Sequence, residues 1–87
     1  MTDDLQQRAE ECARQLYEWC IANGRWVSPD RRVKPETAAE ILGVTHGTLS
    51  NWRSQGVPLP YYRPGARGSV TYRLSDLALR IESELIM

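Results

Sequence analysis

TAAEILGVTHGTLSNWRSQG, the stretch from Thr37 to Gly56, decides how this chain is expected to fold. Its first half predicts a short helix from Ala38 to Leu42. Thr37 and Glu40 have the spacing of a capping box, in which a hydroxyl and a carboxylate satisfy backbone N–H groups at the helix start. Gly43 then breaks the helix, because glycine readily adopts the left-handed conformation that closes many helices. The stretch therefore opens with a helix whose two ends are defined.

The second half of the stretch predicts another helix, from His46 to Ser54, after a tight turn. Thr45 is a favoured N-cap residue, and Gly56 supplies a left-handed stop. Leu49 and Trp52 are three residues apart and therefore share one face of this helix. Two short capped helices joined by a tight turn are typical of a helix-turn-helix unit.

A β-hairpin is expected after these helices, from Tyr61 to Arg73. The turn sequence Pro64-Gly65-Ala66-Arg67-Gly68 lies in the middle of this segment. Val70, Tyr72 and Leu74 alternate with polar residues, which predicts a strand returning from the turn.

A long amphipathic helix is expected at the N-terminus, from Thr2 or Asp3 to about Ala22, with Asn23-Gly24 ending it. Its apolar residues recur at spacings of three and four, namely Leu5, Ala9, Cys12, Leu16, Trp19 and Cys20. An extended connection with a turn follows over 25–36. At the other end of the chain Ser75 is the expected cap of a last helix, which carries Leu77, Ile81 and Leu85 on one stripe.

Length allows one domain: the 87 residues divide into the N-terminal helix (1–24), the connection (25–36) and the helix-turn-helix part (37–87). Asp3 and Asp4 stand where a signal peptide would carry basic residues, and no apolar run approaches a membrane span. We therefore expect a cytoplasmic protein without a membrane partner.

The order of these elements resembles the winged helix-turn-helix domains of phage and integrative-element excisionases, and the DNA-binding half of MerR-type regulators. The resemblance covers Pro35 to about Arg80 and rests on Ala39 before Gly43, the Leu-x-x-Trp pair, the hairpin and the later Ser-Asp-Leu. It implies a mainly α fold with a small β-hairpin wing, to which this chain adds its long N-terminal helix. Double-stranded DNA is the partner that it implies.

Base contacts are expected from the outward face of the second helix, which would enter the major groove. That face carries His46, Gly47, Ser50, Asn51 and Ser54. Asn51 is the foremost candidate, because its amide can bond adenine N6 and N7 together. Gly47 stands where excisionases often place a long polar residue. Few side chains on this face can therefore contact bases, and DNA shape is expected to contribute to specificity.

Phosphate contacts are expected to supply most of the affinity. The candidates flank the second helix or lie near the hairpin: Thr45, Thr48, Arg53, Arg63, Arg67, Arg73 and Lys34. Arg67, at the tip of the turn, is the foremost of them. For Arg63 and Arg73 the alternative is that their stems pack on Tyr61 or Tyr72 within the sheet.

Charge is unevenly distributed although the formal net charge is zero. From Met1 to Gly24, five acids and two bases give a net of −3. From Arg25 to Arg73, eight bases and three acids give +5, and from Leu74 onward three acids and one base give −2. The positive segment thus coincides with the helix-turn-helix and hairpin, where phosphate contacts would be made.

No cofactor, metal or catalytic activity is expected. Cys12 and Cys20 are eight residues apart on a helix, about 12 Å along its axis, which is beyond disulfide reach. The single histidine, His46, belongs to a different motif, so close-spaced metal ligands are missing. No serine or cysteine has a base positioned beside it.

The N-terminal apolar stripe has two interpretations. It folds onto the rest of the domain, or it pairs with a second copy and forms a dimer that reads two half-sites. The residues in question are Leu5, Cys12, Leu16 and Trp19.

The resemblance implies an excisionase-like recombination directionality factor, which bends DNA, biases an integrase or recombinase toward excision and in several cases also represses transcription. Such proteins also assemble as homodimers or cooperative multimers on DNA. Three alternatives stay open: a terminase small subunit, a small MerR-like regulator, and an adaptor that binds protein and not DNA.

Overall fold

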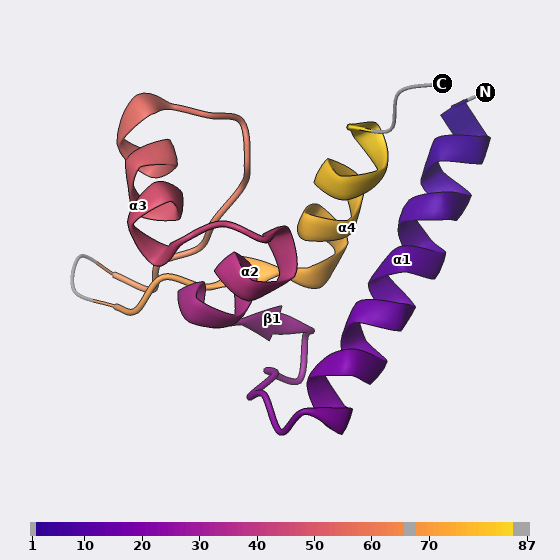
Figure 1. The fold of residues 1–87 in the computed structure, drawn as a ribbon, viewed down its shortest axis with the longest axis horizontal. Coiled ribbons are helices and arrows are strands. Elements are labelled where there is room, and N and C mark those ends of the chain that lie inside the picture. Colours follow the sequence, from indigo (N-terminus) through magenta and orange to yellow (C-terminus); the bar gives the residue numbers. More distant parts are fainter. Residues whose placement is uncertain (1, 66–67, 85–87) are drawn as a thin grey trace.

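Four helices and a two-stranded antiparallel sheet make up this protein in the computed structural model, which describes residues 2–65 and 68–84. In chain order the elements are α1 (Thr2–Ala22), β1 (Arg32–Val33), α2 (Pro35–Leu42), α3 (His46–Gln55), β2 (Tyr72–Arg73) and α4 (Leu74–Ser83). Figure 1 shows α1 and α4 side by side, α2 in the middle and α3 at the end of the molecule away from α1. The expected mainly α fold is confirmed at this level. No helix in these ranges is long and apolar enough to cross a membrane.

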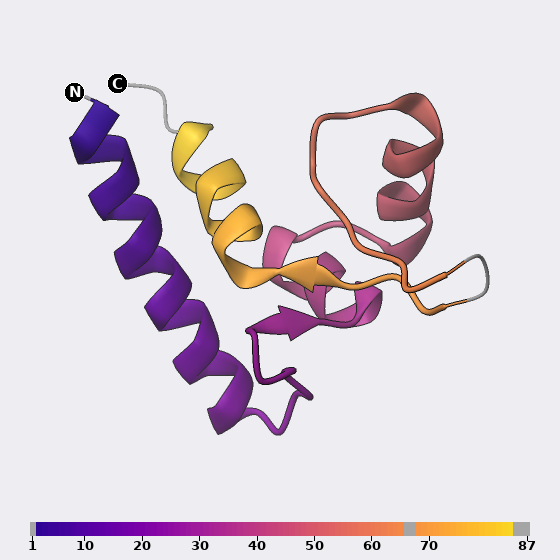
Figure 2. The ribbon, with the colours of Figure 1, turned by 180° about the vertical axis from the view of Figure 1, so that it is seen from behind.

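The long N-terminal helix is confirmed with the expected bounds, and its apolar face packs along α4 (Figures 1 and 2). Ala9 and Cys20 are buried, and Leu16 and Tyr17 pack against the core. The helix ends where the chain turns through Gly24, whose φ is +68°. In this structure the apolar stripe therefore covers the rest of the chain, which is the first of its two interpretations.

The stripe is not buried along its whole length. Leu5 and Cys12 are half-buried, whereas Trp19 is 37% exposed and lies 5.6 Å from the Arg25 guanidinium. Trp19 is therefore only partly covered by the rest of the chain.

The connection between α1 and α2 contains a short strand that the sequence pattern did not predict. In β1, Arg32 pairs with Arg73 and Val33 with Tyr72. The connection also ends earlier than expected, because α2 already begins at Pro35. Proline fixes φ near the helical value and needs no N–H partner at the first helical position, which explains the early start.

The expected capping box at the start of α2 is wrong. Lys34 occupies the N-cap position, so Thr37 falls inside the helix, where it is buried. The Glu40 carboxylate instead accepts two hydrogen bonds from Arg25, at 2.8 and 2.7 Å. The other end is as expected, because Gly43 closes α2 with φ +72°.

The second helix of the unit, α3, is confirmed in its caps. The Thr45 hydroxyl accepts a hydrogen bond from the Thr48 N–H at 3.0 Å, and Gly56 ends the helix with φ +74°. Leu49 is fully buried, whereas Trp52 is only half-buried against the core. Three of the four expected helix ends in the opening stretch, at Gly43, Thr45 and Gly56, are therefore confirmed.

The start of α4 differs from expectation. Leu74, expected at the end of a strand, is the first residue of α4, and Ser75 lies exposed inside that helix and does not cap it. The Leu74 N–H is already satisfied by the Arg31 carbonyl at 2.9 Å. Beginning the helix here also buries Leu74 on the same face as Leu77 and Ala78. Of the expected stripe, Ile81 is half-buried, and Leu85 lies outside the described residues.

The segment between α3 and α4 folds back on itself. Tyr62 and Thr71 exchange two backbone hydrogen bonds of 2.9 Å, so the two limbs pair as in a hairpin. The returning limb leads into Tyr72, whose side chain is completely buried among Val33, Leu49 and the other core residues. The core therefore fixes where the base of this hairpin lies relative to α3.

Candidate nucleic-acid interface

The outer face of α3 is polar and exposed. His46, Gly47, Asn51 and Ser54 are exposed there, whereas Ser50 is half-buried. The Asn51 amide makes no hydrogen bond to another described residue, so both its donor and its acceptor are free. Burial of Leu49 on the opposite face orients these residues outward. Of the five expected base contacts, four are therefore fully presented to solvent.

The first turn of α3 is held by its own hydroxyl groups. Besides accepting from the Thr48 N–H, the Thr45 hydroxyl donates to the Thr48 hydroxyl at 2.9 Å. This leaves the Thr48 hydroxyl proton available to an outside acceptor. Backbone N–H groups at the start of a helix form a favourable place for an anion. Both threonines thus remain in position for a phosphate contact.

Arg53 differs from its expected role as a simple phosphate contact. Its Nη1 donates to the Tyr72 hydroxyl at 2.7 Å, and its guanidinium lies 5.8 Å from the centre of the Tyr61 ring. The side chain therefore ties α3 to the base of the hairpin. A guanidinium has five N–H donors, so the remaining ones can still reach an anion.

The hairpin carries two expected phosphate contacts among the described residues and one outside them. Arg63 is exposed, and Arg73 is exposed with its guanidinium 5.0 Å from the Tyr62 ring. The ring beside Arg73 is that of Tyr62 and not the expected Tyr61 or Tyr72. Arg67 lies outside the described residues. The two views in Figures 1 and 2 show the hairpin projecting at the end of the molecule that also holds α3.

Basic side chains divide sharply according to their partners. Five of those described form ion pairs with carboxylates, namely Arg8, Arg14, Arg25, Arg32 and Arg80. Among the described residues the other five have no such partner: Arg31, Lys34, Arg53, Arg63 and Arg73. All five of these lie between Arg31 and the end of β2, so the unpaired positive charge among the described residues belongs to the part of the sequence that contains α3 and the hairpin.

Two carboxylates in this part of the chain already form ion pairs with arginines. The hydrogen bonds from Arg25 hold the pKa of Glu40 below its ordinary value. For Asp30, a hydrogen bond from Ser28 lowers the pKa first, and Arg32 lowers it further at 2.9 Å. Both acids are therefore ionised at neutral pH, and each already pairs with its own arginine.

Sequence reasoning missed two residues near this surface. Trp26 is 49% exposed, with the Lys34 ammonium 5.8 Å from its ring. Arg31 has a φ of +66°, and its guanidinium lies 3.6 Å from the centre of the Tyr17 ring. The signal for Trp26 was its place in a polar loop rather than on an apolar stripe. Nothing local in the sequence indicates the conformation of Arg31.

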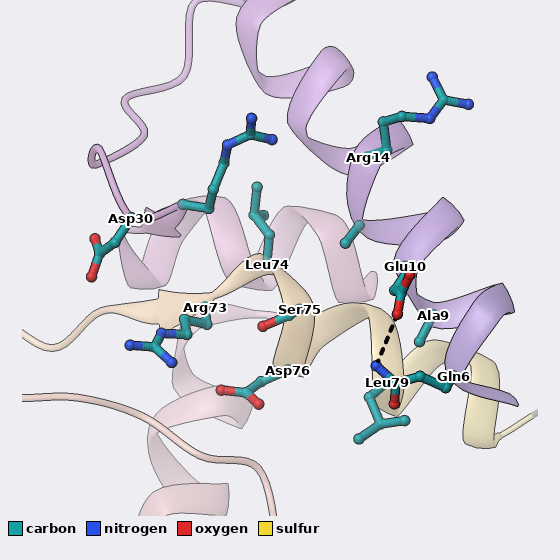
Figure 3. A pocket seen from close by; sticks show the side chains of 12 residues that line it. Gln6, Ala9, Glu10, Arg14, Asp30, Arg73, Leu74, Ser75, Asp76 and Leu79 are labelled. Atoms are coloured by element: carbon teal, nitrogen blue, oxygen red, sulfur yellow. Dashed lines mark hydrogen bonds between the residues drawn. The ribbon is translucent and has the colours of Figure 1, made fainter. Parts of the chain in front are cut away.

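A separate pocket of about 570 Å³ lies between α1 and the start of α4. It is lined by both acids and bases, including Glu10, Arg14, Asp30, Arg73 and Asp76. Figure 3 shows their charged ends spread around the pocket rather than converging on one point. The pocket therefore presents opposite charges from several elements rather than one focused cluster.

The two thiols do not add a reactive or metal-binding group. Burial raises the pKa of Cys12 and, likewise, that of Cys20, so both thiols are protonated at neutral pH. Within the described residues no three Cys, His, Asp or Glu side chains gather as a metal site.

Comparison with known proteins assigns no role to these residues. No family model matches the chain, and no curated protein and no solved structure matches it. The candidate interface depends on the geometry and the charge of the chain itself.

Proposed function

We propose that this protein binds double-stranded DNA by placing α3 in the major groove. The helix is short, capped at both ends and polar on its outer face, where Asn51 has a free amide. An α-helix fits the major groove of B-DNA, and an Asn amide there pairs best with adenine. Gly47 allows the helix backbone to come close to the DNA but reads no base. Specificity therefore depends on few base contacts together with DNA shape.

The observation that carries the proposal is the separation of paired from unpaired basic side chains. All five unpaired bases in the described chain belong to the part of the sequence with α3 and the hairpin, and the bases of α1 and α4 are matched by acids. Two of the five, Arg31 and Arg73, line the pocket beside α1. The other three, Lys34, Arg53 and Arg63, belong to the segments around α3 and the hairpin. A phosphate backbone supplies the missing negative charge and releases counterions as it binds.

The hairpin acts in this proposal as the wing of a winged helix-turn-helix domain. Its base is fixed to α3 through the Arg53 contact with Tyr72, so helix and hairpin approach the DNA as one body. Arg63 and Arg67 then meet the DNA backbone beside the groove that α3 occupies. The order of elements supports this assignment, since the helix-turn-helix precedes the hairpin and α4 follows it.

For the biological role we propose an excisionase-like recombination directionality factor, on the strength of the sequence resemblance. In that role the protein binds near an attachment site, acts with an integrase and also represses transcription. A terminase small subunit or a small MerR-like regulator would use the same surface. A footprint on the attachment region of the element separates these roles: protection there supports excision, and protection at a packaging site or a promoter alone supports the others.

The test of DNA binding is the salt dependence of affinity for a fluorescently labelled duplex, measured by anisotropy. Several phosphate contacts predict a slope of log affinity against log salt of roughly −3 to −6. A duplex that shows no binding at ~50 mM salt would contradict the proposal, because phosphate contacts are strongest at low salt. That outcome would favour the protein-binding adaptor.

A further inference from the structure

Lys34 stands at a position where a lysine is unfavourable. It is the N-cap residue of α2, with extended backbone angles (φ −73°, ψ 159°) and no side-chain cap hydrogen bond. Ser, Thr, Asp and Asn are preferred there, because their oxygens accept a backbone N–H that otherwise lacks a partner. A cation is also repelled by the positive end of the helix dipole. Residues that lower stability in this way are often those that serve binding.

The side chain of Lys34 lies beside an exposed aromatic ring. Its ammonium is 5.8 Å from the centre of the Trp26 ring, and Trp26 itself is 49% exposed. Trp26 also forms one wall of a groove of about 370 Å³ at the base of the hairpin. The groove is lined by Trp26, Ser28, Arg32, Pro64, Ser69 and Thr71. The unpaired Lys34 ammonium therefore lies near the tryptophan that forms one wall of the groove.

The groove lies on the side of the hairpin away from α3. In both Figure 1 and Figure 2 the hairpin runs between α3 and β1. Arg53 contacts the hairpin from the α3 side at Tyr61, whereas Trp26 adjoins Pro64 and Ser69 from the other side.

The lining of the groove matches the chemistry of a sugar–phosphate backbone. Trp26 and Pro64 offer apolar surface to the carbon atoms of deoxyribose, and the exposed Ser69 offers a hydroxyl to a phosphate oxygen. Arg32 adds little net charge, since Asp30 pairs with it at 2.9 Å. The free positive charges near this flank are therefore those of Lys34 and of Arg73, which pairs with Arg32 across the two strands.

We propose that Trp26, Lys34 and Ser69, the Trp26–Lys34 patch, bind the DNA backbone on the flank of the hairpin opposite α3. A deoxyribose packs on the indole ring, and the adjoining phosphate forms an ion pair with the Lys34 ammonium. The proposal rests on the proposed DNA binding and extends its surface into the connection between α1 and α2. It gives a role to two features that the fold leaves unexplained, an exposed tryptophan and a lysine at a helix N-cap.

Two variants test the patch on the full chain by salt-dependent anisotropy with a labelled duplex of mixed sequence. Lys34→Ser should make the slope of log affinity against log salt shallower by ~0.9, one phosphate contact, while raising the thermal midpoint through the restored cap. Trp26→Ala should weaken binding about tenfold at fixed salt without changing the slope, since it removes apolar contact and no charge.

Matched controls lie on α1. Arg14→Gln changes the net charge by the same amount as Lys34→Ser, and Trp19→Ala removes another partly exposed tryptophan. Neither control should change the affinity or the slope. If Trp26→Ala loses its helical circular dichroism, Trp26→Leu replaces it in the comparison.

Lys34 is also the only lysine of the chain, so an amine-directed acetylating reagent modifies it selectively besides the N-terminal amine. Bound duplex should slow acetylation of Lys34, measured by mass spectrometry, and should leave the N-terminal amine unaffected. Wild-type affinity and slope in both patch variants, with unprotected Lys34, would overturn this inference while the proposed function stands. If the wild-type chain binds no duplex at ~50 mM salt, the proposed function fails and the patch with it.

Discussion

Replacing Tyr72 by phenylalanine tests whether α3 and the hairpin are held together as one body. The Tyr72 ring is completely buried, and its hydroxyl accepts a hydrogen bond of 2.7 Å from Arg53. Tyr72→Phe keeps the ring and its packing but leaves the guanidinium without that partner. A hydrogen bond to a charged group contributes about 1.5–3 kcal/mol, and partial exposure of Arg53 places the expected loss near the lower end, at about 1.5 kcal/mol.

The control is Tyr62→Phe, the same chemical change on the other side of the hairpin. Tyr62 is half-buried, and its hydroxyl donates to Asp76 over a longer distance of 3.3 Å. Its loss should cost less, about 0.5 kcal/mol, because solvent can replace the partner.

Urea unfolding followed by tryptophan fluorescence measures both variants. The midpoint should fall with an unchanged m-value, since the surface exposed on unfolding stays the same. For a domain of this size, a loss of about 1.5 kcal/mol corresponds to a fall in thermal midpoint of roughly 6–12 °C. If Tyr72→Phe destabilises the protein no more than Tyr62→Phe does, the Arg53 link does not secure α3 to the hairpin.

Three further predictions concern the glycines of α3, the stability of the fold at acid pH and the contact of Asn51 with a DNA base. Gly56→Ala should lower the free energy of unfolding by about 1 kcal/mol, because φ is +74° there. Gly47→Ala should raise it by about 0.5–1 kcal/mol, since the new Cβ meets only the Thr45 hydroxyl at 3.9 Å. Urea unfolding compares the two variants, and equal shifts would contradict the backbone argument. Arg25 lowers the pKa of Glu40 from 4.5, so the pair stabilises the fold above that pH and the contribution is lost as pH falls through the lowered value. Glu40→Gln should therefore reduce the fall in the free energy of unfolding between neutral and acid pH, measured by unfolding at a series of pH values. An unchanged fall would exclude the pair as its source. Asn51→Ala should relax preference at one base pair in a binding selection on randomised duplexes, and a uniform loss on every sequence would remove its base-reading role.

Helix ends that depend on neighbouring residues could be predicted from the sequence. Thr45 caps α3 because its hydroxyl needs only the N–H three residues on, and Gly43 and Gly56 reach positive φ without a Cβ penalty. The amphipathic pattern of α1 likewise fixed its bounds and its buried face. These features are set within one or two turns of chain, so composition and spacing are sufficient.

Features that depend on distant partners could not be predicted. β1 exists because Val33 pairs with Tyr72, far along the chain, and that same strand places the Arg31 carbonyl against the first N–H of α4. This contact removes the need for Ser75 as a cap. Thr37 was displaced from its expected role by Pro35, which starts α2 earlier. Each wrong cap reflects a competing interaction that the local pattern does not contain.

The candidate interface likewise has features that could be predicted from the sequence and others that could not. The outward face of α3 follows from the period of a helix, and four of its five expected residues are exposed. Charge counts could not show which basic side chains lack an acidic partner. Arg25 and Arg32 belong to the positive segment and yet form ion pairs with Glu40 and Asp30. The exposure of Trp26 likewise depends on how its loop lies against the hairpin.

The most direct measurement is an amide chemical-shift map of the ¹⁵N-labelled protein during titration with a mixed-sequence duplex at low salt. DNA docking through α3 and the hairpin predicts shifts concentrated in 46–54 and 62–71, with smaller shifts beside Trp26 and Lys34. The outer face of α1, where Arg14 pairs with Glu11 and Glu18, should remain unperturbed. Shifts centred on α1, or none at all at saturating duplex, would contradict DNA binding by this surface.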